Sequence, residues 1–113
     1  MQILYKSTRG GESGVPASRA VLNGLSGDGG LYVPEELPKL EVPLERLAGM
    51  SYQDLAYEVM SRFLPDYTEE ELRHCINSAY DAKFATPELA PLRQADGAYF
   101  LALFNGKTIA FRD

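Results

Sequence analysis

Two amphipathic segments on either side of Pro65 constrain the fold of this chain more than any other feature. Ser51 suits the N-cap of the first segment, because its hydroxyl can accept a hydrogen bond from a free backbone N–H group. Apolar residues then follow at helical spacing, namely Tyr52, Leu55, Ala56, Val59, Met60 and Phe63. The sequence therefore predicts a helix that begins after Ser51 and ends before Pro65.

The second segment begins with Thr68 and Glu71, which have the spacing of a capping box. The apolar stripe that follows consists of Leu72, Cys75, Ile76, Ala79 and Tyr80. This pattern predicts a second helix and places Cys75 in the core. The acidic run Glu69–Glu71 favours the positive end of the helix dipole and is not interpreted as a metal site.

Shorter elements are predicted at the beginning of the chain. Ile3–Tyr5 favours a strand that runs into a polar, glycine-rich loop at residues 6–11. Pro16 and the apolar residues after it predict a short helix that ends near Gly24. Leu31–Val33 favours a second strand, followed by an extended connector through residues 34–43 because of its three prolines.

Near the end of the chain, Tyr99–Phe104 is almost entirely apolar, which is typical of a strand covered on both faces. With 113 residues and 45% hydrophobic residues, the chain can form one small domain. The elements together predict an α+β fold, with a small β-sheet packed with two main amphipathic helices and one short helix.

Charge and cysteine content argue against several classes of function. The formal net charge is −5, and the sequence has no cluster of basic residues, which disfavours nucleic acids and anionic membranes as partners. Cys75 is the only cysteine and His74 the only histidine, so neither an internal disulfide nor a Cys/His metal site is expected. We expect a cytoplasmic protein without a targeting segment or a membrane span.

Several blocks of residues, in order along the chain, give a more specific indication. They are Ser7-Thr8-Arg9-Gly10, Ala20-Val21-Leu22-Asn23-Gly24-Leu25, Asp28-Gly29-Gly30-Leu31-Tyr32-Val33-Pro34, Ser51-Tyr52-Gln53-Asp54-Leu55-Ala56, Ala79-Tyr80 and the segment from Leu103 to Asp113. In these blocks, and over essentially its whole length, the chain resembles the threonine synthases.

The resemblance implies a lyase of threonine biosynthesis. This enzyme uses pyridoxal 5′-phosphate to convert O-phospho-L-homoserine and water into L-threonine and phosphate. By the same resemblance, residues 1–100 correspond to the amino-terminal domain, and residues 101–113 to the truncated start of the catalytic region. The expected partner is the catalytic region of the same polypeptide, and self-association through an exposed apolar face is also possible. We expect no cofactor-binding residue and no bound cofactor in this chain, and no activity from it alone.

Three residues depart from the family pattern. Asn105, Lys107 and Arg112 stand where the family usually has histidine, proline and lysine. Arg112 occupies the position of the lysine that forms the Schiff base, and a guanidinium offers no free amine lone pair. Two explanations stay open: a degenerate paralogue, or a chain cut at a domain edge of an altered protein. An alternative function is therefore a non-catalytic binding or interaction module, with an unrelated small binding domain as a third interpretation.

Ser7, Thr8 and Arg9 are the candidate substrate-binding residues. Two hydroxyls and a guanidinium beside a glycine-rich backbone suit a phosphate group. An ordinary polar turn that ends the first strand explains the same residues equally well, and both interpretations stay open. Asp28 and the glycines after it are interpreted as a turn with positive φ angles and not as a ligand site.

Overall fold

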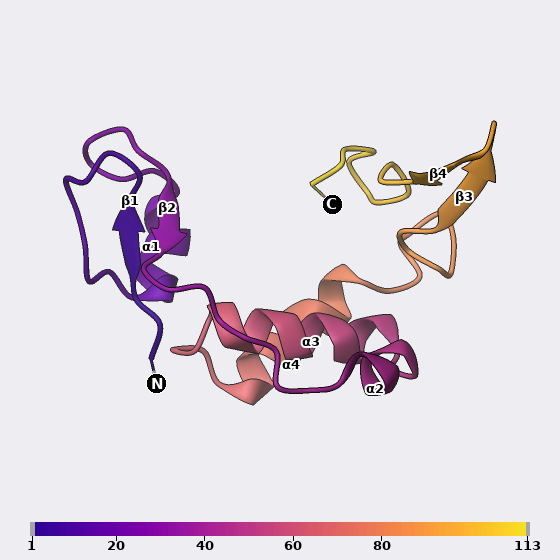
Figure 1. Cartoon of the computed structure of the whole chain (residues 1–113), viewed down its shortest axis with the longest axis horizontal. Helices are drawn as coiled ribbons and strands as arrows, with labels where there is room; N and C mark the ends of the chain where they lie inside the picture. The colour runs from indigo at the N-terminus through magenta and orange to yellow at the C-terminus, as the bar shows by residue number, and fades with distance from the viewer. Residues whose placement is uncertain (1, 113) are drawn as a thin grey trace.

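The computed structural model describes residues 2–112 and has an α+β architecture, which confirms the predicted class (Figure 1). In chain order, the elements are β1 (Tyr5–Ser7), α1 (Ala17–Asn23), β2 (Tyr32–Pro34), α2 (Leu44–Ala48), α3 (Tyr52–Phe63), α4 (Glu69–Ala79), β3 (Leu92–Ala95) and β4 (Ala98–Leu101). The strands form two separate antiparallel pairs, β1–β2 and β3–β4, where the sequence predicted one small sheet.

The first sheet and α1 form an amino-terminal unit with its own small core. Strands β1 and β2 pair from Tyr5 opposite Pro34 to Ser7 opposite Tyr32. The strand predicted at Ile3–Tyr5 is therefore displaced by two residues, because the backbone partners lie farther along the chain. The core of this unit consists of Tyr5, Val15, Ala17 and Ala20, with Ile3, Tyr32 and Leu64 packed against it. The predicted short helix is confirmed as α1, and it ends at Gly24 with a φ of +74°.

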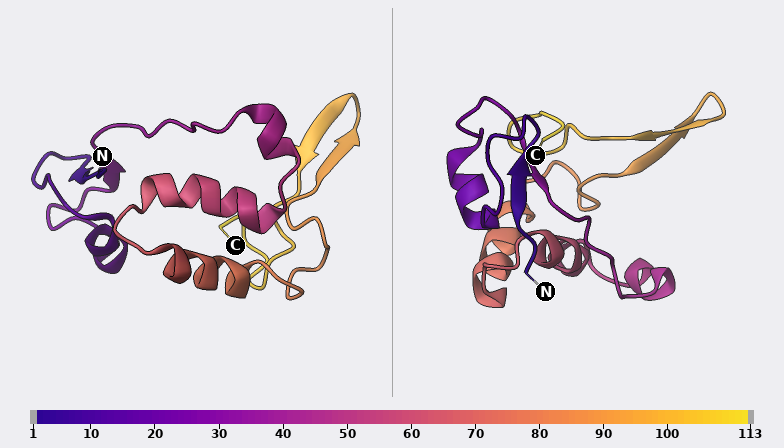
Figure 2. Two further views of the ribbon diagram at one scale, coloured as in Figure 1. Left: turned by 90° about the horizontal axis from the view of Figure 1, so that it is seen from below. Right: turned by 60° about the vertical axis from the view of Figure 1, so that its left-hand side comes forward.

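The two amphipathic helices form where their caps predicted them. The Ser51 hydroxyl accepts a hydrogen bond from the Asp54 N–H at 3.1 Å at the start of α3. At the start of α4, Thr68 and Glu71 make both bonds of the capping box, at 3.2 and 2.8 Å. Helix α4 packs beside α3, as both views in Figure 2 show.

The buried stripe of α4 is narrower than its sequence predicted. Leu72 and Ile76 are buried, with 3% and 2% of their surface exposed, whereas Cys75 is exposed. The assignment of Cys75 to the core is therefore wrong. A helix that packs mainly against one neighbour buries the residues one turn apart on the facing side, and Cys75 lies off that line.

A short helix that was not predicted from the sequence follows the connector. Residues 35–43 are largely extended, as predicted, but the short helix α2 follows Pro43. Proline is well tolerated at the beginning of a helix, and the residues Leu-Glu-Arg-Leu-Ala after it are good helix formers. Two long-range hydrogen bonds tie the amino-terminal unit to the helix pair: Tyr5 OH to the Phe63 carbonyl at 2.6 Å, and the Ser18 N–H to Asp66 at 2.9 Å.

The second sheet is a hairpin that projects from the helices (Figures 1 and 2). Its strands pair from Leu92 opposite Leu101 to Ala95 opposite Ala98, around Asp96 and Gly97, which have φ angles of 49° and 73°. All eight strand residues are exposed. The expectation that Tyr99–Phe104 is a strand covered on both faces is therefore wrong, and pairing with β3 stops at Leu101. Apolar residues show that a strand can be buried, but they do not show whether another segment of the same chain packs against it.

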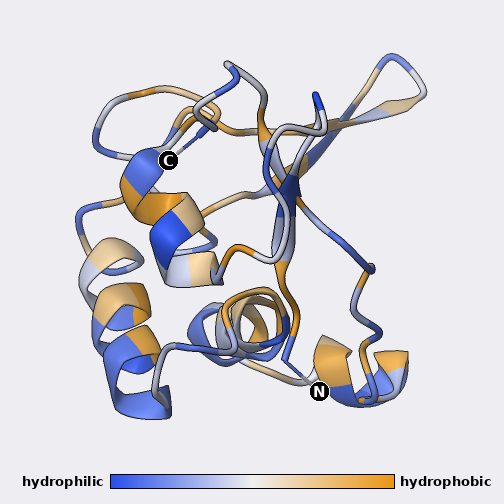
Figure 3. Ribbon diagram, turned by 90° about the vertical axis from the view of Figure 1, so that its left-hand side faces the viewer, coloured by the Kyte–Doolittle hydropathy of each residue, from blue (hydrophilic) through white to orange (hydrophobic). Residues whose placement is uncertain are grey.

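The shape of the chain is open. Its radius of gyration is 16.2 Å, compared with about 13 Å for a compact domain of this length. Large apolar side chains stand at the surface, and Figure 3 shows hydrophobic residues on α2 at the periphery of the molecule. Among residues 2–112, no helix is long and apolar enough to cross a bilayer, and no group of potential ligands is arranged to hold a metal ion.

Candidate functional site

The carboxylate of Asp28 joins two glycine-rich loops, residues 7–14 and 26–31, at one end of the amino-terminal unit. It accepts hydrogen bonds from the Ser7 hydroxyl at 2.7 and 2.8 Å, from the Gly11 N–H at 2.8 Å and from the Gly30 N–H at 2.9 Å. These bonds stabilise the charged form, and the Ser7 hydroxyl contributes most, so the pKa of Asp28 falls from 3.8 to about 2. The two loops are thus held by an ionised side chain.

Glycine is needed beside this carboxylate for two different reasons. Gly29 has a φ of +82°, as the predicted turn requires. Gly30 does not have a positive φ, but a Cβ there would collide with the Ser7 hydroxyl oxygen and approach Asp28 to 3.0 Å. A Cβ at Gly11 would lie 2.5 Å from Asp28 Oδ2. The Asp28 carboxylate therefore occupies the space that a Cβ at Gly11 or Gly30 would need.

A second carboxylate, Glu12, reinforces the same pair of loops and was not singled out from the sequence. It accepts hydrogen bonds from the Ser26 hydroxyl, from Tyr32 OH at 2.7 Å and from the Gly27 N–H at 3.2 Å. These bonds lower the pKa of Glu12 below its usual value, and the bond from Ser26 has the largest effect. No sequence pattern links Glu12 to partners that lie 14 to 20 residues away, so this group emerges only from the folded chain.

The three candidate phosphate ligands occupy different positions on these loops. Ser7 is buried, and its hydroxyl donates to Asp28 and accepts from the Arg9 N–H at 3.1 Å. Thr8 is exposed and its hydroxyl oxygen accepts from the Leu31 N–H at 3.0 Å, which leaves the hydroxyl hydrogen for donation. Arg9 is exposed, with one guanidinium nitrogen donating to the Asp28 carbonyl at 3.1 Å. Thr8 and Arg9 are therefore at the surface, whereas Ser7 is buried.

The residues that depart from the family pattern lie in another region, near the carboxyl-terminal end of the described chain. Arg112 is exposed and lines a pocket of about 180 Å³ together with Asn105. The aromatic residues of this pocket are Tyr52, Tyr80, Phe84 and Phe111. Asn105 is buried, and its side-chain Nδ2 has no hydrogen-bond partner. Lys107 lines a separate hollow beside α4.

The structure does not bring these two groups of candidate residues together. In Figure 1, the carboxyl-terminal segment, in yellow, lies well apart from the β1–β2 unit, in indigo and purple. The described residues therefore do not form one continuous active site between the two glycine-rich loops and Arg112.

Comparison with known proteins gives a consistent family. The family model described as threonine synthase N terminus matches residues 4–80. Threonine synthase of Schizosaccharomyces pombe is 40% identical over 116 residues, which cover 99% of this chain and 22% of that protein. The human protein threonine synthase-like 1 is 39% identical over 101 residues, which cover 85% of this chain and 14% of that protein.

A solved structure agrees with these sequence matches. The crystal structure of threonine synthase from Brucella melitensis with bound pyridoxal phosphate has a TM-score of 0.81 and 33% identity, covering 98% of this chain and 24% of that one. This chain thus spans about a quarter or less of the relatives it matches. By its family match, its sequence identity and its fold, the chain belongs to the threonine synthase family, whose amino-terminal segment it matches.

Proposed function

We propose that this chain is the amino-terminal domain of a longer protein that converts O-phospho-L-homoserine and water into L-threonine and phosphate in threonine biosynthesis. The isolated chain is inactive, because it lacks a complete catalytic site. Residues 1–100 form the domain itself, and residues 101–113 begin the catalytic region. The protein acts in the cytoplasm, a location that agrees with its single cysteine and the absence of an internal disulfide.

The observation that carries this proposal is the open shape of the chain. A TM-score of 0.81 over 98% of the chain means that the same open arrangement occurs within a protein about four times longer. The hairpin and the segment after it expose large apolar residues, namely Leu92, Tyr99, Phe100, Leu101, Leu103, Phe104, Ile109 and Phe111. Large apolar side chains concentrated in one part of a chain often mark a surface that a partner covers. We infer that the catalytic region of the same polypeptide covers it, and that the isolated chain self-associates through it.

The glycine-rich loops supply the second part of the proposed function. Thr8 and Arg9 contact the phosphate group of the substrate, since an exposed hydroxyl and a guanidinium are strong donors for phosphate oxygens. Ser7 and Asp28 position these two residues from beneath.

Pyridoxal phosphate, the cofactor named for the Brucella melitensis structure, does not fit the described residues of this chain. At the position where the family has its lysine, the exposed Arg112 presents a guanidinium, which stays protonated and cannot condense with an aldehyde. The pocket of about 180 Å³ beside it is smaller than most ligand pockets. Cofactor binding is therefore assigned to the longer protein and not to this chain.

Arg112 also favours a second candidate function. A longer protein with arginine at this position and no substitute lysine would be a non-catalytic binding or interaction module of the threonine synthase type. The match to human threonine synthase-like 1 is consistent with either function, since its printed name states no activity.

Two chimeras of Schizosaccharomyces pombe threonine synthase separate the domain's role from the effect of Arg112. The first receives residues 4–100 of this chain in place of its own segment, and the second receives residues 4–112. We expect the first to release phosphate from O-phospho-L-homoserine. Activity of the second supports the catalytic function, whereas inactivity that Arg112→Lys restores supports the non-catalytic one. Failure of the first chimera, when it is folded, would exclude the proposed role of the domain.

Absorption spectra of the same proteins test the second candidate function. A covalently attached pyridoxal phosphate absorbs at about 420 nm, and borohydride abolishes the band. We expect this band in the first chimera and in the Arg112→Lys protein. Its presence in the chimera that retains Arg112 would mean that another lysine holds the cofactor, which contradicts the non-catalytic interpretation.

A further inference from the structure

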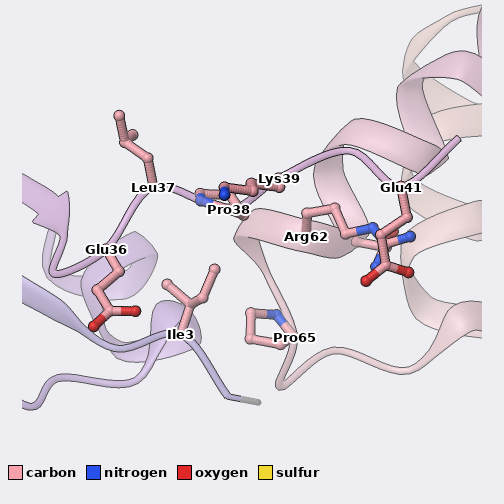
Figure 4. A pocket seen from close by; sticks show the side chains of 9 residues that line it. Ile3, Glu36, Leu37, Pro38, Lys39, Glu41, Arg62 and Pro65 are labelled. Carbon is pink, nitrogen blue, oxygen red and sulfur yellow. The ribbon is translucent and has the colours of Figure 1, made fainter. Parts of the chain in front are cut away.

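A pocket of about 400 Å³ lies where three segments distant in the sequence meet. The segment before β1, the connector after β2 and the carboxyl-terminal end of α3 all contribute to it (Figure 4). Its volume falls within the range of about 300–1,000 Å³ that is typical of small-molecule sites. It is separate from both the glycine-rich loops and the Arg112 pocket.

The lining of this pocket combines apolar and charged side chains. In Figure 4, Ile3, Pro38 and Pro65 group together, and Arg62 lies beside Glu41. Lys39 and Glu36 add one further charge of each sign. The lining thus has two positive and two negative side chains. A ligand with a net charge is repelled by one of these pairs, whereas a ligand with one charge of each sign can pair with both.

Arg62 has donors that the chain does not use. Its Nε is buried without a hydrogen-bond partner. The carboxylates that it pairs with are Glu41, at 3.6 Å, and Glu58, at 3.9 Å, and both distances exceed the range of an N–H···O hydrogen bond. The Arg62 side chain is 32% exposed, so a ligand carboxylate can pair with the guanidinium at a distance that the chain's own carboxylates do not reach. Glu41 is 80% exposed and therefore free to turn toward a cation.

We propose that this pocket binds a free α-amino acid with a branched apolar side chain. The α-carboxylate pairs with the Arg62 guanidinium, the α-ammonium with Glu41, and the side chain packs against Ile3, Pro38 and Pro65. An amino acid carries an ammonium and a carboxylate group on one carbon atom next to its side chain, which matches a charge-balanced pocket with an apolar group beside an ion pair. This inference is independent of the function proposed for the glycine-rich loops.

The test uses L-leucine and two analogues, each of which lacks one charge. 4-Methylpentanoate has no ammonium group, and 3-methylbutylamine has no carboxylate. Each compound is titrated into the 113-residue chain while the Arg62 Nε–H and Ile3 N–H signals are followed by nuclear magnetic resonance. We expect saturable shifts with L-leucine and binding at least about tenfold weaker for both analogues, because each loses one charge-assisted contact.

Variants of two arginines complete the test. We expect Arg62→Gln to weaken L-leucine binding by about tenfold or more, and Arg19→Gln, the same change on the exposed face of α1, to leave it unchanged. Arg62→Lys keeps the charge, and we expect it to bind with intermediate affinity, so it carries the test if Arg62→Gln does not fold. The proposal is overturned if L-leucine causes no saturable shift by about 10 mM, or if either analogue binds as tightly.

Discussion

The two sheets of this protein have the same number of strands and opposite surroundings. The β1–β2 sheet has a helix beside it, a small apolar core and two carboxylates that satisfy the backbone of its loops. The β3–β4 hairpin has a well-formed ladder and turn, but all of its strand residues are exposed. A two-stranded sheet alone is marginally stable in water, so it needs a cover or a network of side chains. The first sheet has both within this chain, and the second has neither.

The largest expected effect comes from adding a methyl group to the loops of the first sheet. In Gly30→Ala, the new Cβ collides with the Ser7 hydroxyl and crowds Asp28 and Thr8. We expect a loss of about 3 kcal/mol in the free energy of unfolding, measured with urea. Gly27→Ala is the matched control, because its Cβ meets nothing within 4 Å, and it should cost less than about 1 kcal/mol. Equal losses in the two variants would contradict the close packing around Asp28.

The next effect is a dependence of stability on acid. The folded pKa of Asp28 lies below its usual value, so its contribution is fully present above about pH 4 and is lost as the pH falls toward about 2. We expect the urea midpoint to fall over this range and Asp28→Asn to reduce that dependence, with the remainder from the other carboxylates of lowered pKa, namely Glu12, Asp54, Asp66 and Asp81. The same change at Asp96, in the turn of the exposed hairpin, should leave it intact. If the urea midpoint depends on pH to the same extent in both variants, the carboxylate of Asp28 does not stabilise the first sheet in the way proposed.

A smaller effect is expected at the turn of the hairpin. Gly97 has a φ of +73°, where a residue with a Cβ is disfavoured by about 1 kcal/mol. In Gly97→Ala, we expect faster hydrogen exchange of the amides in β4 and no change in those of β1 and β2. Slower exchange throughout the chain, or exchange that changes equally in both sheets, would show that the hairpin is not an independent unit.

The smallest effect is expected on the exposed face of the hairpin. Phe100 is 55% exposed, so Phe100→Ser should change the unfolding free energy of this chain by less than about 0.5 kcal/mol. In the chimera with residues 4–100, where the catalytic region would cover the hairpin, we expect the same change to cost about 2 kcal/mol or more. A similar small loss in both proteins would argue that this surface remains exposed, and would weaken the proposed interface.

The candidate site was predicted only in part. The sequence identified Ser7, Thr8 and Arg9 as a polar cluster, but the burial of Ser7 against Asp28 required the folded structure. Glu12 was missed because its partners lie on a different loop. The hairpin, in contrast, had a local signal that was overlooked, since Asp96-Gly97 between two strand-like runs is a favoured turn.

Local chemistry by itself determined the caps of α3 and α4, the start of α1 after Pro16 and the turn at Gly29, because each depends on residues a few positions apart. Only the tertiary structure decided that the strands form two sheets, that Cys75 is exposed and that the apolar residues of β4 have no cover in this chain. Pairing and burial depend on which distant segments meet, and the periodicity of one segment carries no information about its neighbour in space.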